Sequence, residues 1–173
     1  MKQTSQPTAP PSRQPTRALG KPAQDDIRTP RQVRTLIADD SPFGLKALAR
    51  ILLIEGNFPL VGTATDGCQA VRQAFILQPE LILMDYDMPH MDGIEARRFI
   101  KQFKNPPLVI IVTSNNTPEC RALAKAAGAD GFVDKGGDLH GQLRMVFQEL
   151  LRAVSGTIPC QEVSRSQRPR GCV

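Results

Sequence analysis

Leu81-Ile82-Leu83-Met84-Asp85-Tyr86-Asp87-Met88-Pro89-His90-Met91-Asp92-Gly93 is the stretch of sequence that decides the fold of this chain. Its four consecutive apolar residues indicate a strand buried on both faces, as in the middle of a parallel sheet. The apolar run ends on a carboxylate, Asp85, and a loop containing proline and glycine follows it. Ligands of open α/β sheets bind outside the carboxyl ends of the strands, so Asp85 is placed for chemistry.

Apolar runs and helical periods alternate on both sides of this stretch. Ser41 followed by Pro42, Asp92, Thr117 followed by Pro118, and Asp138 are expected to begin helices, because small polar caps and an early proline favour a helix start. Strands alternating with helices through short connections predict a doubly wound parallel sheet, (βα)5. The predicted strands are 33–38, 58–64, 80–85, 108–113 and 131–135, and the predicted helices are 42–55, 67–77, 93–104, 118–127 and 139–154.

Composition divides the chain into three parts. Residues 1–32 hold six of the fifteen prolines and almost no large apolar side chain, so we expect a disordered basic tail there. Residues 33–154 are expected to form the folded domain, and residues 155–173 a second disordered tail. The net charge of +5 belongs to the two ends, because residues 35–155 sum to −2. The basic balance is therefore weak evidence for nucleic-acid binding.

Targeting signals and a cysteine framework are not evident. No apolar run of membrane-spanning length and no secretory segment stands in the sequence, so we expect a soluble, cytoplasmic protein with no membrane partner. The four cysteines lack CxxC spacing and are expected to be reduced thiols, with a Cys160–Cys172 disulfide as the alternative.

Several predicted strands end on a polar functional group: Asp39-Asp40, Asp85, Thr113 and Lys135. A sheet of order 2-1-3-4-5, the flavodoxin-like order, would bring these groups to one rim. Two carboxylates about 4 Å apart repel by roughly 4 kcal/mol at an effective dielectric near 20. Lys135 offsets one of three negative charges, so the cluster calls for a divalent cation or for protonated carboxylates. Oxygen ligands favour Mg²⁺.

A magnesium ion beside a carboxylate, a lysine and a threonine hydroxyl is an arrangement suited to phosphoryl transfer. The metal and the ammonium group would neutralise charge on the phosphoryl oxygens. Asp85 is the candidate nucleophile, because a carboxylate can form an acyl phosphate.

With these residues in order, the chain resembles the receiver domain of the two-component response regulators, of the stand-alone, chemotaxis type. The resemblance covers roughly residues 33–154. It rests on Asp39-Asp40 after the first strand, on LILMDYDMPHMDG, on IIVTSNN and on GFVDK, which follow one another at suitable spacing.

The resemblance implies a role for each matched residue. Asp85 would accept a phosphoryl group from the phosphohistidine of a sensor histidine kinase. Asp39, Asp40 and Asp85 would hold Mg²⁺, Asp40 directly, together with the backbone carbonyl of Asp87. Lys135 would pair with the phosphoryl group and Thr113 would hydrogen-bond it. Phe132 matches the aromatic switch position, whose ring turns inward when Thr113 moves toward the phosphate.

The sequence also departs from the family pattern. The usual Lys-Pro is Lys135-Gly136 here, so a cis-proline peptide is not expected. The residues after the last helix are too few to form an output domain, so no DNA-binding domain is expected. Output would then be a contact with a downstream protein through the face of the fourth helix, fifth strand and fifth helix.

Plainer interpretations stand beside these. Asp39-Asp40 could be a solvated turn, Lys135 a surface lysine, Thr113 a strand end and Phe132 ordinary packing. We expect no enzyme activity beyond self-catalysed phosphotransfer and dephosphorylation. A phosphatase with a nucleophilic aspartate is an alternative suggested by Asp85-Tyr86-Asp87, and a pseudo-receiver that binds partners without phosphorylation is another.

Overall fold

The computed structural model describes residues 31–155, and the two predicted disordered tails fall almost wholly outside these residues. Five parallel strands have the order β2-β1-β3-β4-β5, which confirms the predicted topology. The strands are β1 (Thr35–Ala38), β2 (Leu60–Ala64), β3 (Leu81–Met84), β4 (Leu108–Thr113) and β5 (Gly131–Asp134). The helices are α1 (Pro42–Glu55), α2 (Gly67–Leu77), α3 (Gly93–Ile100), α4 (Pro118–Ala126) and α5 (Leu139–Ser155).

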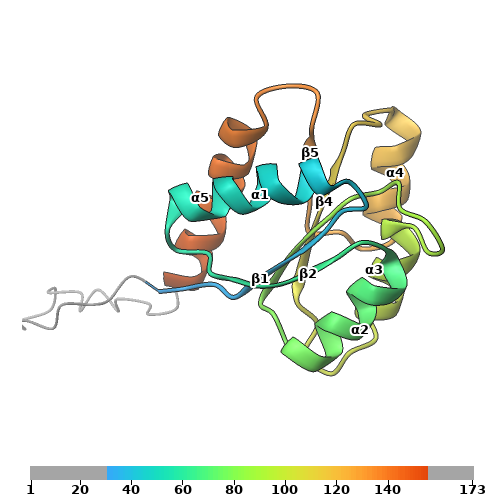
Figure 1. Ribbon diagram of the computed structural model, residues 1–173, viewed down its shortest axis with the longest axis horizontal. Helices are drawn as coiled ribbons and strands as arrows, with labels where there is room; N and C mark the ends of the chain where they lie inside the picture. Colours follow the sequence, from blue (N-terminus) through green and yellow to red (C-terminus); the bar gives the residue numbers. More distant parts are fainter. Residues whose placement is uncertain (1–30, 156–173) are drawn as a thin grey trace, which may run out of the picture.

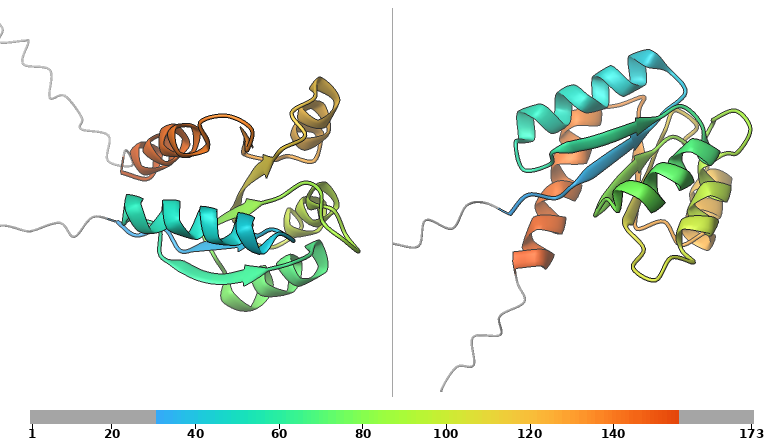
Figure 2. Two further views of the ribbon diagram at one scale, coloured as in Figure 1. Left: turned by 45° about the horizontal axis from the view of Figure 1, so that its top comes forward. Right: turned by 60° about the horizontal axis from the view of Figure 1, so that its bottom comes forward.

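The helices cover the sheet in two layers. Figures 1 and 2 show α1 and α5 together on one face and α2, α3 and α4 on the other. Each face has its own apolar core. One core joins Leu48 of α1 to Leu143 and Phe147 of α5, and the other joins Ala70 of α2 to Ile100 of α3. The central strands β1 and β3 are buried along their whole length, which confirms the burial that the uninterrupted apolar run of β3 predicted.

Polar side chains begin four of the helices. The side chains of Ser41, Asp66, Asp92 and Thr117 each accept a hydrogen bond from the backbone N–H three residues later. These bonds satisfy N–H groups that have no partner within the helix. At the start of α5, Oδ1 of Asp138 accepts from the backbone N–H of Gly141 at 2.9 Å. The caps at Ser41, Asp92, Thr117 and Asp138 confirm the predicted helix starts.

The end of α3 corrects a prediction, since the helix was expected to reach Lys104 and ends at Ile100. Beyond that point the backbone N–H groups of Gln102 and Phe103 donate to the carbonyls of Phe99 and Ile100. Bonds three residues back tighten the chain into turns. Phe103 then packs against the core below α2 and α3. The chain beyond Ile100 therefore contributes to the core from a turn and not from a helix.

Candidate functional site

Two neighbouring strands carry the acidic residues to one place. Ala38 pairs with Met84 at the carboxyl ends of β1 and β3, so Asp39 and Asp85 leave the sheet side by side. The backbone N–H of Asp85 donates to the carbonyl of Ala38 at 2.8 Å, which continues the ladder by one residue. Carboxylate oxygens of Asp39, Asp40 and Asp85 lie within 4.8 Å of one another. The sheet order therefore gathers the predicted acidic cluster.

Lys135 reaches this cluster from the end of β5. Its Nζ atom lies 2.7 Å from Oδ2 of Asp39 and 2.7 Å from Oδ2 of Asp85. Asp39 is fully buried and Asp85 is nearly so, whereas Asp40 is exposed. One ammonium group thus bridges the two buried carboxylates, and the interpretation of Lys135 as a surface lysine is wrong.

Backbone groups hold the other oxygens of the two buried carboxylates. The N–H of Ser41 donates to Oδ1 of Asp39 at 2.9 Å, and the N–H of Tyr86 donates to Oδ1 of Asp85 at 2.8 Å. Gly44, in the first turn of α1, leaves the space that Asp39 occupies, because a Cβ atom there would overlap the Asp39 carboxylate. Position 44 therefore needs glycine, because the Asp39 side chain approaches its backbone closely.

Burial and charge act in opposite directions on the bridged pair. Burial raises the pKa of Asp85, the hydrogen bond and charge of Lys135 oppose the rise, and the charge of Asp39 adds to it, so the net shift is upward. Burial lowers the pKa of Lys135, but the two carboxylates outweigh it and raise the pKa. Lys135 is therefore charged at neutral pH, and its charge opposes the upward shift that burial and Asp39 impose on the pKa of Asp85.

These residues fit a magnesium ion. The cluster offers carboxylate oxygens and no imidazole or thiol, and one of its members, Asp40, is open to solvent. One lysine cannot neutralise three carboxylates. A divalent cation held by Asp39, Asp40 and Asp85 would balance the charge and would favour the ionised form of Asp85.

The other predicted site residues lie along the same rim. Thr113 ends β4 and is fully buried, and its Oγ1 accepts from the N–H of Asn115 at 3.0 Å. Asp87 is exposed in the loop after β3. Phe132 lies on β5 opposite Ile111 of β4 and is half-buried.

Sequence reasoning missed a polar network beside Phe132. The guanidinium carbon of Arg121, on α4, lies 4.6 Å from the centroid of the Phe132 ring. Nε of Arg121 donates to Oδ1 of Asn116 at 2.6 Å, and the Asn116 amide donates to Oδ2 of Asp134 at 2.7 Å. This network joins α4, the loop after β4 and the end of β5. Nothing in the spacing of these residues indicates the contact.

Among residues 31–155, no helix is both long enough and apolar enough to cross a membrane.

Comparisons with known proteins agree with this geometry. The family model "Response regulator receiver domain" matches residues 35–146. A protein-glutamate methylesterase/protein-glutamine glutaminase of Thermotoga maritima is 36% identical over 122 residues, which are 70% of this chain and 35% of that protein. A protein of the same name from Pseudomonas fluorescens is 42% identical over 105 residues, 60% of this chain and 28% of the relative. The chain thus spans about a third of the length of these relatives.

Solved structures of response regulator proteins are also similar to this chain. The crystal structure of the response regulator domain of Thermotoga maritima CheB is similar with a TM-score of 0.62 and 32% identity, over 75% of this chain and 100% of that one. The CheX-CheY-BeF3-Mg+2 complex of Borrelia burgdorferi contains a chain that is similar with a TM-score of 0.63 and 29% identity, over 69% of this chain and 90% of that one. The matched residues, the strand order and the acidic rim together place this chain in the family of response regulator receiver domains, which act in two-component signal transduction.

Proposed function

We propose that Asp85 is the phospho-acceptor of this receiver domain and that its phosphodonor is the phosphohistidine of a sensor histidine kinase. The observation that carries the proposal is the position of Asp85. It is a nearly buried carboxylate that shares one lysine with Asp39 and lies beside the solvent-exposed Asp40. A cluster with this charge needs a cation and can accommodate a phosphoryl group.

Phosphoryl transfer would form a bond between an Asp85 carboxylate oxygen and phosphorus, and would break the bond between phosphorus and the donor's imidazole nitrogen. Asp85 must act in its ionised form, and Lys135 helps to maintain that form through its 2.7 Å contact. After transfer, the same ammonium group would pair with the phosphoryl oxygens while its bond to Asp39 holds it in place. Asp39, Asp40, Asp85 and the Asp87 carbonyl would hold Mg²⁺. The bound ion would supply charge neutralisation on the phosphoryl oxygens.

The response to phosphorylation would run through Thr113 and Phe132. Thr113 would turn its hydroxyl to the phosphoryl group, and the ring of Phe132 would move inward from its place under Arg121. The surface that changes would be the face of α4, β5 and α5. Leu123 and Met145 are exposed apolar residues on its two helices and are available to a downstream protein.

The similar proteins support two parts of this proposal. The Borrelia burgdorferi complex contains CheY with BeF3 and Mg+2, the latter matching the cation expected here. The methylesterase relatives match over the receiver region and extend well beyond it. We therefore assign no ester hydrolysis to this chain, and its proposed chemistry is limited to its own phosphorylation and dephosphorylation.

The test is phosphorylation by a small phosphodonor such as acetyl phosphate with Mg²⁺, followed by intact mass measurement. We expect the wild-type chain to gain one phosphoryl group and the Asp85→Ala variant to gain none. Glu149→Gln, which removes an exposed carboxylate from α5, is the matched control and should behave as wild type. A wild-type chain that gains no phosphoryl group and forms no beryllofluoride adduct would overturn the proposal and favour the pseudo-receiver alternative.

A further inference from the structure

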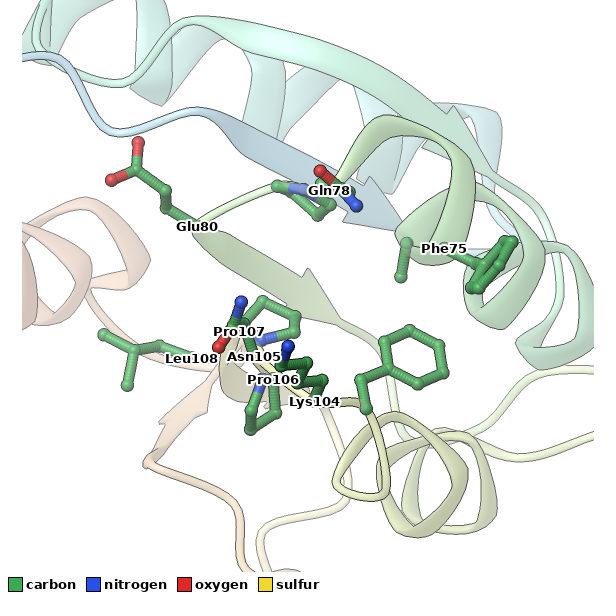
Figure 3. Close-up of a pocket in the computed structure, with 11 residues that line it drawn as sticks. Phe75, Gln78, Glu80, Lys104, Asn105, Pro106, Pro107 and Leu108 are labelled. Carbon is green, nitrogen blue, oxygen red and sulfur yellow. The ribbon is translucent and has the colours of Figure 1, made fainter.

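An apolar groove lies at the amino ends of β3 and β4, at the end of the sheet opposite the acidic rim. Its walls are Phe75 at the end of α2 and Phe103, Pro106 and Pro107 from the segment between α3 and β4, and its volume is about 570 Å³ (Figure 3). The rings of Phe75 and Phe103 meet edge to face, with centroids 6.1 Å apart. Phe75 is 72% exposed. A hollow of this size falls within the roughly 300–1,000 Å³ range of ligand pockets.

The chain enters the fold at the rim of this groove. The carbonyl of Arg34 accepts from the N–H groups of Glu80 and Leu81 at 2.8 and 3.2 Å, and the Arg34 guanidinium donates to the carbonyl of Leu77 at 2.7 Å. Three residues earlier in the chain, Arg31 pairs with the carboxylate of Glu80 at 2.6 Å. Glu80 itself lines the groove. Arg31, the first residue that the structure describes, therefore lies beside Glu80 at the wall of the groove.

We propose that the groove is a docking site for the proline-rich segment Pro7–Pro15 of the same chain. The segment reads Pro-Thr-Ala-Pro-Pro-Ser-Arg-Gln-Pro and holds four prolines. Proline-rich segments adopt the polyproline II conformation at little entropic cost and bind grooves lined by aromatic rings. With three residues per turn, Pro7 and Pro10 fall on one side of such a helix and can face the two rings together.

The connection is long enough for this return. Fifteen residues, 16–30, separate the segment from Arg31, and a flexible chain of that length has an r.m.s. span of about 20–23 Å. A span of this size gives an effective concentration in the millimolar range. A proline-rich contact whose Kd lies below this concentration would be occupied within one molecule. The occupied groove would shield the Phe75 ring, which is otherwise an exposed aromatic side chain.

Photo-crosslinking of the full chain tests the proposal. Phe75→p-benzoylphenylalanine places the reactive group on the groove, and Phe43→p-benzoylphenylalanine is the matched control, since Phe43 is 81% exposed on α1. After irradiation and tryptic digestion, we expect crosslinks from position 75 to the peptide 3–13 and none from position 43. A mixture of ¹⁴N and ¹⁵N chains tells intramolecular from intermolecular products. Crosslinks that avoid residues 7–15, or that join ¹⁴N to ¹⁵N chains, would overturn the assignment.

Limited proteolysis provides an independent measurement. Trypsin cleavage after Arg13 should accelerate several-fold in Phe75→Ser and stay at the wild-type rate in Phe43→Ser. Equal thermal unfolding of the two variants shows that the domain is intact. An unchanged cleavage rate in Phe75→Ser would contradict docking, whatever the outcome of the phosphorylation test.

Discussion

Lys135 donates a hydrogen bond to Asp85 at 2.7 Å across fifty residues of sequence, and through the same nitrogen atom it holds Asp39. The bridge joins β5 to β3 and β1 at the rim of the sheet. It makes the arrangement of the acidic site depend on the packing of three strands, and it yields the first of five predictions.

Lys135→Met should destabilise the domain, because it leaves two buried carboxylates without their counter-ion. We expect a loss of roughly 2–3 kcal/mol in the free energy of unfolding near neutral pH without divalent cations, below the about 3–5 kcal/mol of a fully buried pair. The raised pKa of Asp85 sets the sign: protonation removes the unpaired charge, so the loss shrinks as the pH falls toward the unfolded value of 3.8. Urea unfolding across pH measures it. Asp85→Asn in the same variant should recover part of the loss, and no recovery would mean that the charge is not the cause.

Mg²⁺ should stabilise the folded domain and EDTA should remove that stabilisation. Binding to the folded state alone adds about 1.4 kcal/mol at a free ion concentration of ten times Kd. Thermal unfolding with and without Mg²⁺ measures the shift. Asp40→Asn should lose most of the shift, whereas Glu149→Gln should keep it, and an equal shift in both variants would place the ion elsewhere.

Gly44→Ala should weaken the fold although alanine is the better helix former. In an unhindered helix the change would stabilise by roughly 0.5–1 kcal/mol, but a methyl group here overlaps the carboxylate of Asp39. We expect a lower midpoint in urea and a smaller response to Mg²⁺. Ala122→Gly, at an exposed position of α4, gives the ordinary cost of glycine in this protein. A stabilised Gly44→Ala variant would show that Asp39 has room to move.

Arg121→Ala should release the ring of Phe132. The cation–π contact contributes about 0.5–1 kcal/mol at an exposed site, so the effect on stability is small. If the ring moves inward on activation, its release favours the active arrangement, and the variant should form the beryllofluoride adduct at lower fluoride concentration. Nuclear magnetic resonance of the ring protons of Phe132 follows the release of the ring and its inward movement when the adduct forms. Arg121→Lys keeps the charge, so it should form the adduct at a fluoride concentration between those of wild type and Arg121→Ala. If Arg121→Ala needs the same fluoride concentration as wild type, the position of the Phe132 ring does not control activation.

Glu80 should make the stability of the domain depend on pH in the acidic range. Burial raises its pKa, but the hydrogen bonds from the Arg34 N–H and the Arg31 guanidinium outweigh burial and lower it from 4.5. A lowered pKa contributes stability that is present above the unfolded value and is lost as the pH falls through the folded one. Glu80→Gln should therefore flatten the pH dependence of urea unfolding below about pH 4.5. An unchanged slope would mean that Arg31 and Arg34 do not hold this carboxylate in solution.

The sequence by itself determined the alternation of strands and helices and the residues at the strand ends. Apolar runs such as Leu81–Met84 and caps such as Ser41 are local features, and their physical causes act within a few residues. Knowledge of the strand order then placed Asp39, Asp40, Asp85 and Lys135 at one rim, since carboxyl ends of parallel strands meet there.

Only the tertiary structure decided the remaining features. One of them is the early end of α3. The others are contacts between residues whose spacing in the sequence has no period: Arg121 on Phe132, Gly44 beside Asp39, and the groove between Phe75 and Phe103. Each depends on how two elements pack in three dimensions. Periodicity reports which face of an element is buried, but side-chain shape and the packing of the neighbouring element decide what that face touches.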